Sequence, residues 1–457
     1  MDHDSLKKAA LLVATFASFL TPFMGSALNV ALPSIGAEFR TDAITLNWIA
    51  SSYLLSTAVF LLPSGRMADI IGRRKVFTTG ILLFMAGSAL AAISGNVGFL
   101  LFSRIIQGIG SALIFGTGVA IISSVFPPGE RGKALGINVA AVYVGLSVGP
   151  SAGGILTQYW GWRSIFWITL PLGALALYLI FSRLKAEWAE SKGERFDWWG
   201  FLLYGAALVM LMYGFSILPG WTGYVFFGGS ILLIILFIHL QRKLVYPLFD
   251  TGLFRRNRTF AFSNLAALIN YSATFGVGFL LSLYLQYIKN LQPREAGLVL
   301  LAQPLIMAVV SPLSGRLSDK LEPRIVATTG MGLSSLGLLL LVFLNEASTL
   351  FSVVAILMLL GLGFGFFSSP NTNAIMSSVN KKHYGVASGS VGTMRMVGQM
   401  FSLGIVMMIF SVFIGRAEIN PVNYPAFLQS MKISFSVFSV LCFAGIFASL
   451  ARGNLRK

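Results

Sequence analysis

The sequence predicts an all-α membrane protein with fourteen membrane-spanning helices. The 457-residue chain is 56% hydrophobic and only 11% charged, and its mean hydropathy is +0.80. Soluble domains carry about 25% charged residues, so this composition is too apolar for an aqueous environment. Apolar runs of about 20 residues, each long enough to cross a bilayer, recur along the whole chain.

The first run, Ala9–Leu32, follows two lysines as the apolar region of a signal peptide would. It is too long for that region and shows no convincing cleavage site, so we interpret it as the first span. The fourteen predicted spans cover 9–33, 46–64, 76–95, 98–126, 134–157, 164–182, 198–217, 223–241, 259–287, 295–313, 325–344, 348–370, 384–414 and 431–450.

Charge predicts the orientation. An even number of spans places both termini on one side of the membrane. The terminal residues Lys7, Lys8, Arg452, Arg456 and Lys457 indicate that this side is the cytoplasm. Most of the 33 Lys and Arg fall in segments predicted to be cytoplasmic, so the net charge of +17 reflects topology rather than binding to nucleic acid.

Composition also limits the expected partners. The single cysteine, Cys442, lies in an apolar run, which leaves no disulfide framework and no metal-binding pattern. We expect no cofactor, no metal and no nucleic acid. The expected partners are the lipid bilayer and a small-molecule substrate, with protons as the candidate coupling ion. The protein itself is expected to be a monomer in a plasma (inner) membrane.

The spans group as six, two and six. Residues 1–183 are predicted to form an N-terminal six-helix bundle, and 259–457 a C-terminal one. Between them, 184–258 holds a polar cytoplasmic linker, two additional spans and a basic loop. We expect the two additional helices to lie at the periphery, because they have no counterpart in the other half.

A short basic stretch, Gly65–Lys75, interrupts two apolar runs and has a weaker copy at Gly315–Arg324. Both contain Gly-Arg-x-x-Asp, and one copy in each half indicates a duplicated bundle. We expect Gly65 and Gly72 to break the flanking helices. Asp69 has two interpretations, an acceptor that holds the cytoplasmic side closed or a solvated loop charge. The gating candidates from these loops are Gly65, Asp69, Gly72, Arg73, Arg74 and Asp319.

The fifth span contains glycines four residues apart, which therefore share one helix face. That face allows another helix to approach closely, and Pro150 bends the helix. The stretch is either a surface along which helices slide or a merely tight helix contact. The candidates from this span are Gly145, Gly149, Pro150, Gly153 and Gly154.

Two arginines lie within predicted spans, Arg104 in the fourth and Arg395 in the thirteenth. An arginine at that depth is costly and normally faces the bundle interior or water. Each is either a residue of the transport pathway or a structural charge bonded to backbone carbonyls.

No Asp or Glu is placed deep in a span, and His3, His239 and His383 are near the predicted inner surface. Proton relays within membranes usually use a buried acid or histidine. Neutral polar and aromatic residues do lie within spans, and each makes either a helix–helix hydrogen bond or a ligand contact. They are Asn29, Tyr53, Tyr143, Asn270, Tyr271, Tyr284, Gln286, Gln303, Asn371 and Asn373.

Together these motifs resemble the major facilitator superfamily over essentially the whole chain, and the six-two-six layout resembles its fourteen-helix drug:proton antiporter branch. Gly65–Lys75 matches the family's loop signature, and Arg104-Ile105-Ile106-Gln107-Gly108 is similar to its fourth-helix signature. Gly145–Gly154 resembles the fifth-helix signature associated with antiporters. Trp162–Phe166 and Asn29–Pro33 resemble further signatures of the drug-exporter branch.

The resemblance implies two six-helix bundles around a central cavity, which rock to give alternating access. It also implies that the fifth-helix stretch lies at the bundle interface. One position departs from the pattern: Met24 stands where the branch usually carries an aspartate implicated in coupling. The candidates for the transport pathway are Met24, Asn29, Arg104, Gln107, Asn270, Gln303, Asn373 and Arg395.

The expected function is secondary-active export of amphipathic organic compounds, of the multidrug efflux type and coupled to protons. Two arginines without a carboxylate predict a preference for neutral or anionic solutes over cations. One alternative is a facilitator or a carrier not coupled to protons. Another is a non-transporting receptor or assembly protein on a transporter scaffold. An enzyme is not expected, because no catalytic set, metal cluster or phosphate-binding glycine loop is visible.

Overall fold

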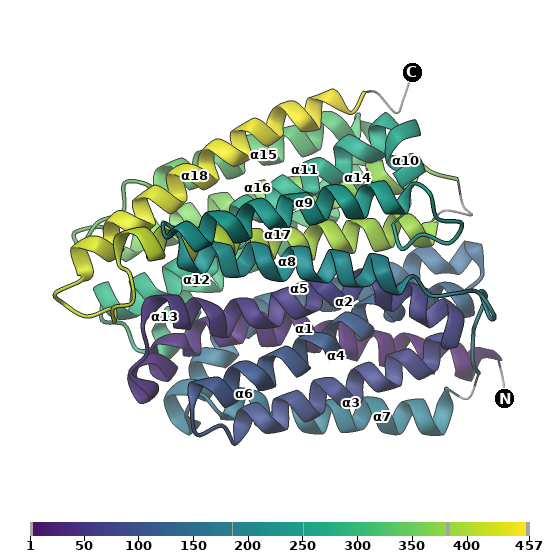
Figure 1. Cartoon of the computed structure of the whole chain (residues 1–457), viewed down its shortest axis with the longest axis horizontal. Coiled ribbons are helices and arrows are strands. Elements are labelled where there is room, and N and C mark those ends of the chain that lie inside the picture. Colours follow the sequence, from purple (N-terminus) through teal and green to yellow (C-terminus); the bar gives the residue numbers. More distant parts are fainter. Residues whose placement is uncertain (1–2, 185, 250, 381–383, 454–457) are drawn as a thin grey trace.

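The structure is a computed structural model, and it describes residues 3–184, 186–249, 251–380 and 384–453. This part of the chain contains helices and no strands. Most helices run along the long axis of the molecule, and both chain termini lie at the right-hand end of Figure 1. We call this the terminal end and the opposite end the distal end.

The first half of the chain, drawn in purple and blue in Figure 1, forms one group of helices. These are α1 (His3–Phe39), α2 (Ala43–Ile71), α3 (Arg73–Ala92), α4 (Val97–Val125), α5 (Pro128–Trp160), α6 (Ser164–Trp167) and α7 (Thr169–Arg183). Within it α1 packs on α5, and α4 packs on both α2 and α3.

The last part of the chain forms a second group that repeats this packing, with α16 against α14 and α15 and with α11 against α17 and α18. Its elements are α11 (Arg258–Thr274), α12 (Gly276–Leu283), the π-helix η1 (Tyr284–Ile288), α13 (Pro293–Leu300), α14 (Ala302–Lys320), α15 (Pro323–Leu341), α16 (Leu350–Ser377), α17 (Tyr384–Phe413) and α18 (Tyr424–Ala451).

Three further helices connect the halves: α8 (Trp198–Ile217), α9 (Trp221–Gln241) and the short α10 (Thr251–Arg256). Helix α8 packs on α2 of the first half and on α17 of the second, whereas α9 packs mainly on α8. Only 17% of the most apolar window of α9 is buried, which places α9 at the periphery.

Fourteen helical stretches are long and apolar enough to cross a membrane, which confirms the predicted number. Three of them are interrupted, at Ile168, Phe275 and Leu301. One boundary prediction was wrong: Gly65 lies inside α2, and only Gly72 ends it. A helix interior tolerates glycine at a cost of about 1 kcal/mol, whereas Gly72 has φ +125°, a value that favours glycine strongly.

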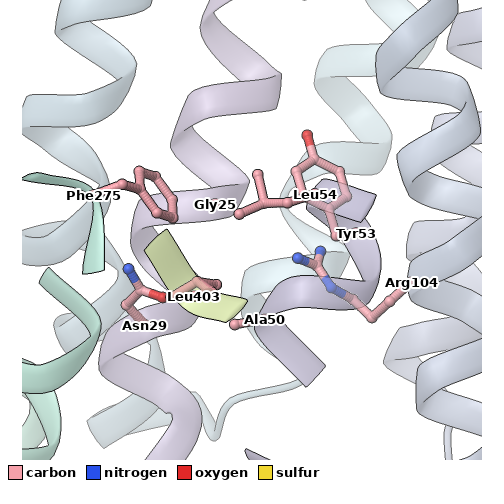
Figure 2. A pocket seen from close by; sticks show the side chains of 8 residues that line it. All are labelled: Gly25, Asn29, Ala50, Tyr53, Leu54, Arg104, Phe275 and Leu403. Carbon is pink, nitrogen blue, oxygen red and sulfur yellow. The ribbon is translucent and has the colours of Figure 1, made fainter. Parts of the chain in front are cut away.

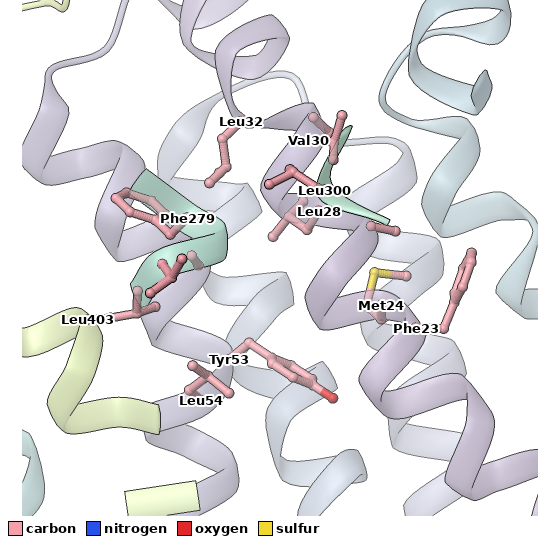
Figure 3. Close-up of a cluster of buried hydrophobic side chains, with 14 of the residues drawn as sticks. Phe23, Met24, Leu28, Val30, Leu32, Tyr53, Leu54, Phe279, Leu300 and Leu403 are labelled. Carbon is pink, nitrogen blue, oxygen red and sulfur yellow. The ribbon is translucent and has the colours of Figure 1, made fainter. Parts of the chain in front are cut away.

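The halves share a continuous apolar core (Figure 3). Phe23 and Leu28 of α1 belong to the same buried cluster as Phe279 of α12, Leu300 of α13 and Leu403 of α17. The two bundles therefore meet through side chains that exclude water in this conformation.

Hydrogen bonds between the halves add to this core near the distal end. Ser282 donates to the carbonyl of Asn29 over 2.6 Å, and Gln286 to that of Val30 over 2.9 Å. The backbone N–H of Ala43 donates to Ala417 over 3.1 Å. We call this set of cross-half contacts at the distal end the distal seam.

Candidate functional site

A small pocket is lined by both halves of the molecule (Figure 2). Its cavity volume in this conformation is about 10 Å³, room for about one water molecule. The lining residues are Gly25 and Asn29 of α1, Ala50, Tyr53 and Leu54 of α2, Arg104 of α4, Phe275 between α11 and α12, and Leu403 of α17. Because both halves contribute, relative motion of the halves would open or remake this pocket.

Arg104 is the charged residue of this pocket, and it is 1% exposed. Its guanidinium lies 4.3 Å from the centre of the Tyr53 ring, and its Nε donates to the carbonyl of Ile49 over 3.3 Å. Its Nη1 donates to Gln107, whose amide donates in turn to Ser88 over 2.7 Å. Neutral acceptors and a ring face therefore stabilise this buried charge, and Gln107 supports Arg104 rather than lining the pocket.

Arg395 lies on α17 in the second half and is partly exposed. Its guanidinium lies 5.1 Å from the ring centre of Phe115, which belongs to α4 of the first half. Nearby, the hydroxyls of Tyr143 on α5 and Ser368 on α16 are 2.9 Å apart. These residues form a second polar centre between the halves, with α4 and α5 of the first half facing α16 and α17 of the second.

The other pathway candidates are dispersed. Met24 is fully buried in the apolar core (Figure 3) and does not line the pocket, whereas Asn29 does and is 8% exposed. Asn270 is fully buried, and neither atom of its amide has a hydrogen-bond partner. Gln303 is partly buried on α14.

Asn373 lies away from the pocket. It is close to the C-terminus of α16, and its amide donates to Ser318 of α14 over 3.0 Å. The structure places Asn373 beside the second basic loop, and its role in the pathway stays a prediction. The side chain of Asp319 in that loop lies outside the described residues.

Three of the spaced glycines of α5 face α1 of their own half, whereas other residues of the same stretch contact the second half. A Cβ on Gly145 would lie 2.5 Å from the carbonyl of Phe19, and one on Gly153 would lie 2.7 Å from Ala27. A Cβ on Gly149 would lie 1.8 Å from the hydroxyl of Ser26. These three glycines therefore allow α1 to pack closely on α5 within the first half.

Pro150 and Gly154, two other residues of this stretch, form part of the interface between the halves. A Cβ on Gly154 would lie 2.3 Å from the carbonyl of Pro293 at the start of α13. Reciprocally, a Cβ on Gly297 of α13 would lie 2.1 Å from the carbonyl of Pro150. These two contacts belong to the distal seam. Periodicity identified the glycine-rich face but could not identify the helix against which each glycine packs.

The first basic loop is a hydrogen-bonded network at the terminal end. Arg73 is 8% exposed, and its Nη2 lies 2.8 Å from the carboxylate of Asp69. Its Nη1 lies 2.8 Å from Glu190 of the linker between α7 and α8. Asp69 and Arg73 therefore form an ion pair, and the linker supplies a second acid.

The linker between α7 and α8 contacts the first basic loop at several points. The carboxylate of Glu187 accepts hydrogen bonds from the backbone N–H groups of Arg74 (2.8 Å) and Lys75 (3.2 Å) at the start of α3. It lies so near Gly72 that a Cβ there would be 2.5 Å from it. An acid at a helix N-terminus is favourable, and Arg74 contributes its backbone here rather than its side chain. Arg66 forms an ion pair with Glu194 of the linker through its side-chain Nη2.

The two basic loops share packing that the motif alone did not reveal. The hydroxyl of Ser64, just before Gly65, donates to the carbonyl of Ala112 over 3.1 Å. Ser314 in the second half donates to Gly365 over 2.6 Å. Each loop is thus joined to the next-but-one span of its own half by the same serine–carbonyl contact, which supports the duplication.

Sequence reasoning missed three groups of residues: the linker acids, Gly297 and Arg452. Arg452 was assigned to the basic tail, but it is 1% exposed and donates to Asn371 over 2.9 Å. Burial lowers the pKa of Arg452 to about 10, which leaves it charged at neutral pH. Its position beside other terminal cations gave no signal of burial.

Comparison with known families agrees with this architecture. The profile described as Major Facilitator Superfamily matches residues 14–403 and, in a second overlapping match, residues 263–454. The riboflavin transporter RibZ of Clostridioides difficile is 31% identical over 445 residues, which cover 96% of each chain. The multidrug resistance protein Stp of Mycobacterium tuberculosis is 32% identical over 417 residues, covering 90% of this chain and 77% of that relative.

Solved structures share the fold. A peptide transporter POT in complex with sulfate superposes with a TM-score of 0.69 at 16% identity, covering 97% of this chain and 98% of that one. A bacterial homologue of the lysosomal transporter Spinster, in an inward-facing and unoccupied conformation, gives 0.66 at 18% identity, covering 98% and 97%. The chain therefore belongs to the Major Facilitator Superfamily, and as a transporter with fourteen membrane-spanning helices it fits the fourteen-helix members of that family.

Proposed function

We propose that the protein exports amphipathic organic compounds from a prokaryotic cell by alternating access, as a proton-driven antiporter of the inner membrane. The pocket between the halves carries this proposal, because a site built by two bundles is remade when they rock. Relatives named for multidrug resistance support export of several compounds rather than one.

The charges of the two polar centres support a preference for neutral or anionic compounds. Arg104 lines the pocket, and Arg395 lies near the seam between the halves. Among the described residues, the acids of the spanning helices lie near helix ends, as Glu38, Asp69 and Glu295 do. A cation would therefore meet positive charge without a carboxylate to offset it. Riboflavin, the cargo in the name of one relative, is a planar amphipathic compound compatible with this class.

The orientation follows from charge. The terminal end carries the basic loop and both termini, so we assign it to the cytoplasm. The distal seam would then close the outer side, and the described conformation would face the cytoplasm, ready to receive substrate. The ion pair of Asp69 with Arg73 would rearrange when this end closes.

The test is transport by purified protein in liposomes. A panel of anionic, neutral and quaternary ammonium aromatic dyes is loaded, and flux is recorded with and without a proton gradient. We expect export of neutral and anionic dyes, accelerated by the gradient. Equal transport of the quaternary ammonium dyes would refute the charge preference, and absence of flux for every dye would refute the export function.

A carrier that is not coupled to protons is the second candidate, and Met24 favours it. This residue is fully buried among apolar side chains, where the resembling branch carries an acid. The same experiment separates the two: flux of the transported dyes that is unchanged by a pH jump would favour the uncoupled carrier.

A further inference from the structure

We propose that Arg395, together with Phe115, Tyr143, Tyr271 and Ser368, forms a subsite that binds the acidic group of an aromatic substrate. This inference rests on the proposed function and deepens it. It assigns the recognition of negative charge to Arg395, one of the two arginines that lie within membrane-spanning helices. Arg104, on this view, is a structural charge of the first half.

The guanidinium of Arg104 is already bonded to neighbouring residues of the first half. This residue is 1% exposed, its Nε is bonded to Ile49, and its Nη1 is bonded to Gln107. Its guanidinium face lies on Tyr53, 4.3 Å from the ring centre. All of these partners belong to the first half, so the charge is stabilised whether or not the halves meet and whether or not a ligand is bound.

Arg395 differs on each point. Its side chain is partly exposed, its Nε is buried without a hydrogen-bond partner, and no described residue forms an ion pair with it. It lies in the middle of α17, where exposure to lipid would be very costly. The exposed part therefore faces the space between the halves, and an unpaired guanidinium there binds an anion favourably.

The groups around Arg395 define what else the ligand carries. Tyr271 of α11 lies close to Arg395, Tyr143 and Ser368. The ring of Tyr271 meets Phe364 edge-on at 5.4 Å, and Phe115 lies under the guanidinium. Ring faces and hydroxyls beside one cation fit a planar aromatic compound with a single carboxylate or similarly acidic group.

No acid competes for this cation. Among the described residues, the membrane-spanning middle parts of α4, α5, α11, α16 and α17 carry no Asp or Glu. These middle parts therefore offer Arg395 no acidic partner. Phe115 and Tyr143 belong to the first half and Arg395 to the second, so a bound anion would contact both bundles.

The experiment measures binding by calorimetry, using purified protein in lipid nanodiscs with two ring-matched probes, 2-naphthoate and 2-naphthamide. Wild-type protein is expected to bind the acid more tightly than the amide at pH 7. Arg395→Gln should weaken binding of the acid about 10- to 100-fold, the loss of one charge-assisted contact, and change binding of the amide less than about threefold. Arg395→Lys should give an intermediate value, because it keeps the charge but loses the planar fork.

Two controls complete the design. Arg416→Gln removes the same charge from an exposed position in the loop before α18 and should leave both affinities unchanged. Arg104→Gln should change the affinities for acid and amide by the same factor. Gel filtration of each variant in detergent checks that it is folded.

Three results would overturn the subsite: no binding of 2-naphthoate, equal affinity of wild type for acid and amide, or equal losses for both probes in Arg395→Gln. The export function fails separately, by absence of flux in liposomes. Charge-selective binding without flux would refute export and support the subsite. Flux without charge-selective binding would support export and refute the subsite.

Discussion

The two ends of the molecule are built differently. At the distal end the halves touch through backbone, with Gly154 against the carbonyl of Pro293 and Gly297 against that of Pro150. At the terminal end the described ion pairs lie within the first half or between it and the linker, as in Arg73 with Asp69 and Glu190. One end uses close packing, and the other uses long charged side chains.

This difference shows which contacts can change partner. Close backbone packing tolerates almost no added volume. The contacts of the distal seam are therefore either all formed or all lost. Exposed ion pairs are worth little individually and exchange easily. We infer that making or breaking the distal seam accounts for most of the free-energy difference between conformations. The ion pairs at the terminal end can exchange partners with little change in free energy.

The largest effect is expected from adding volume to the distal seam. In Gly154→Val or Gly297→Val, the new side chain would collide with a carbonyl of the other half. Overpacking costs about 1–3 kcal/mol, which disfavours the closed seam by about 5- to 150-fold. Transport in liposomes should fall by at least about tenfold.

Gly332→Val on α15 is the matched control, because nothing lies within 4 Å of the position of its Cβ. It should keep transport near the wild-type level. Wild-type transport by either seam variant would show that the seam is not part of the conformational cycle.

A smaller effect is expected from Asp69→Asn. The substitution keeps the shape of the side chain but removes the charge that pairs with Arg73 at 2.8 Å. Stability should change by no more than about 1 kcal/mol, because Glu190 still pairs with Arg73. Transport should fall by about tenfold if this pair is exchanged in every cycle.

Glu418→Gln provides the control, since it removes an exposed acid near the distal end. Asp69→Asn with normal flux would assign the ion pair a purely structural role.

Next comes Glu187→Ala, which removes the acceptor for two N–H groups at the start of α3. Loss of a helix cap costs about 1 kcal/mol. Thermal unfolding followed by tryptophan fluorescence should show a lower transition temperature, with transport reduced less than threefold at room temperature. An unchanged transition would mean that the linker does not stabilise the loop.

The smallest effect is expected from Glu190→Gln. The side chain of Glu190 is 68% exposed, and exposed ion pairs contribute about 0–1 kcal/mol and are screened by salt. Its transition temperature should lie close to that of wild type at low salt and coincide with it at high salt. A loss larger than that of Glu187→Ala would reverse the proposed order within the linker.

Much of the architecture could be predicted from the sequence, because the hydrocarbon core demands long apolar helices. Hydropathy predicted the fourteen spans, and the loop motif identified Asp69 and Arg73 as candidates, which the structure shows to be paired. Motifs could not give the partners of each residue. The glycines of α5 share a face by periodicity, yet only the packed structure shows that Gly149 meets α1 while Gly154 meets α13.

The candidate site was less predictable for the same reason. Depth in a span treated Arg104 and Arg395 alike, but depth does not reveal whether a guanidinium is already bonded. That depends on residues distant in sequence, such as Ile49 for Arg104 and Phe115 for Arg395. The linker acids were also missed, since a polar segment between helices resembles a solvated loop.

The reciprocal motion of the two ends is tested most directly by spin-label distances in nanodiscs. One pair of labels replaces exposed Ala37 and Arg416 near the distal end, and a second replaces exposed Lys75 and Lys320 near the terminal end. Addition of a transported substrate should lengthen the distal distance in part of the population while the terminal distance shortens. Two distances that stay fixed, or that lengthen together, would contradict alternating access through the distal seam.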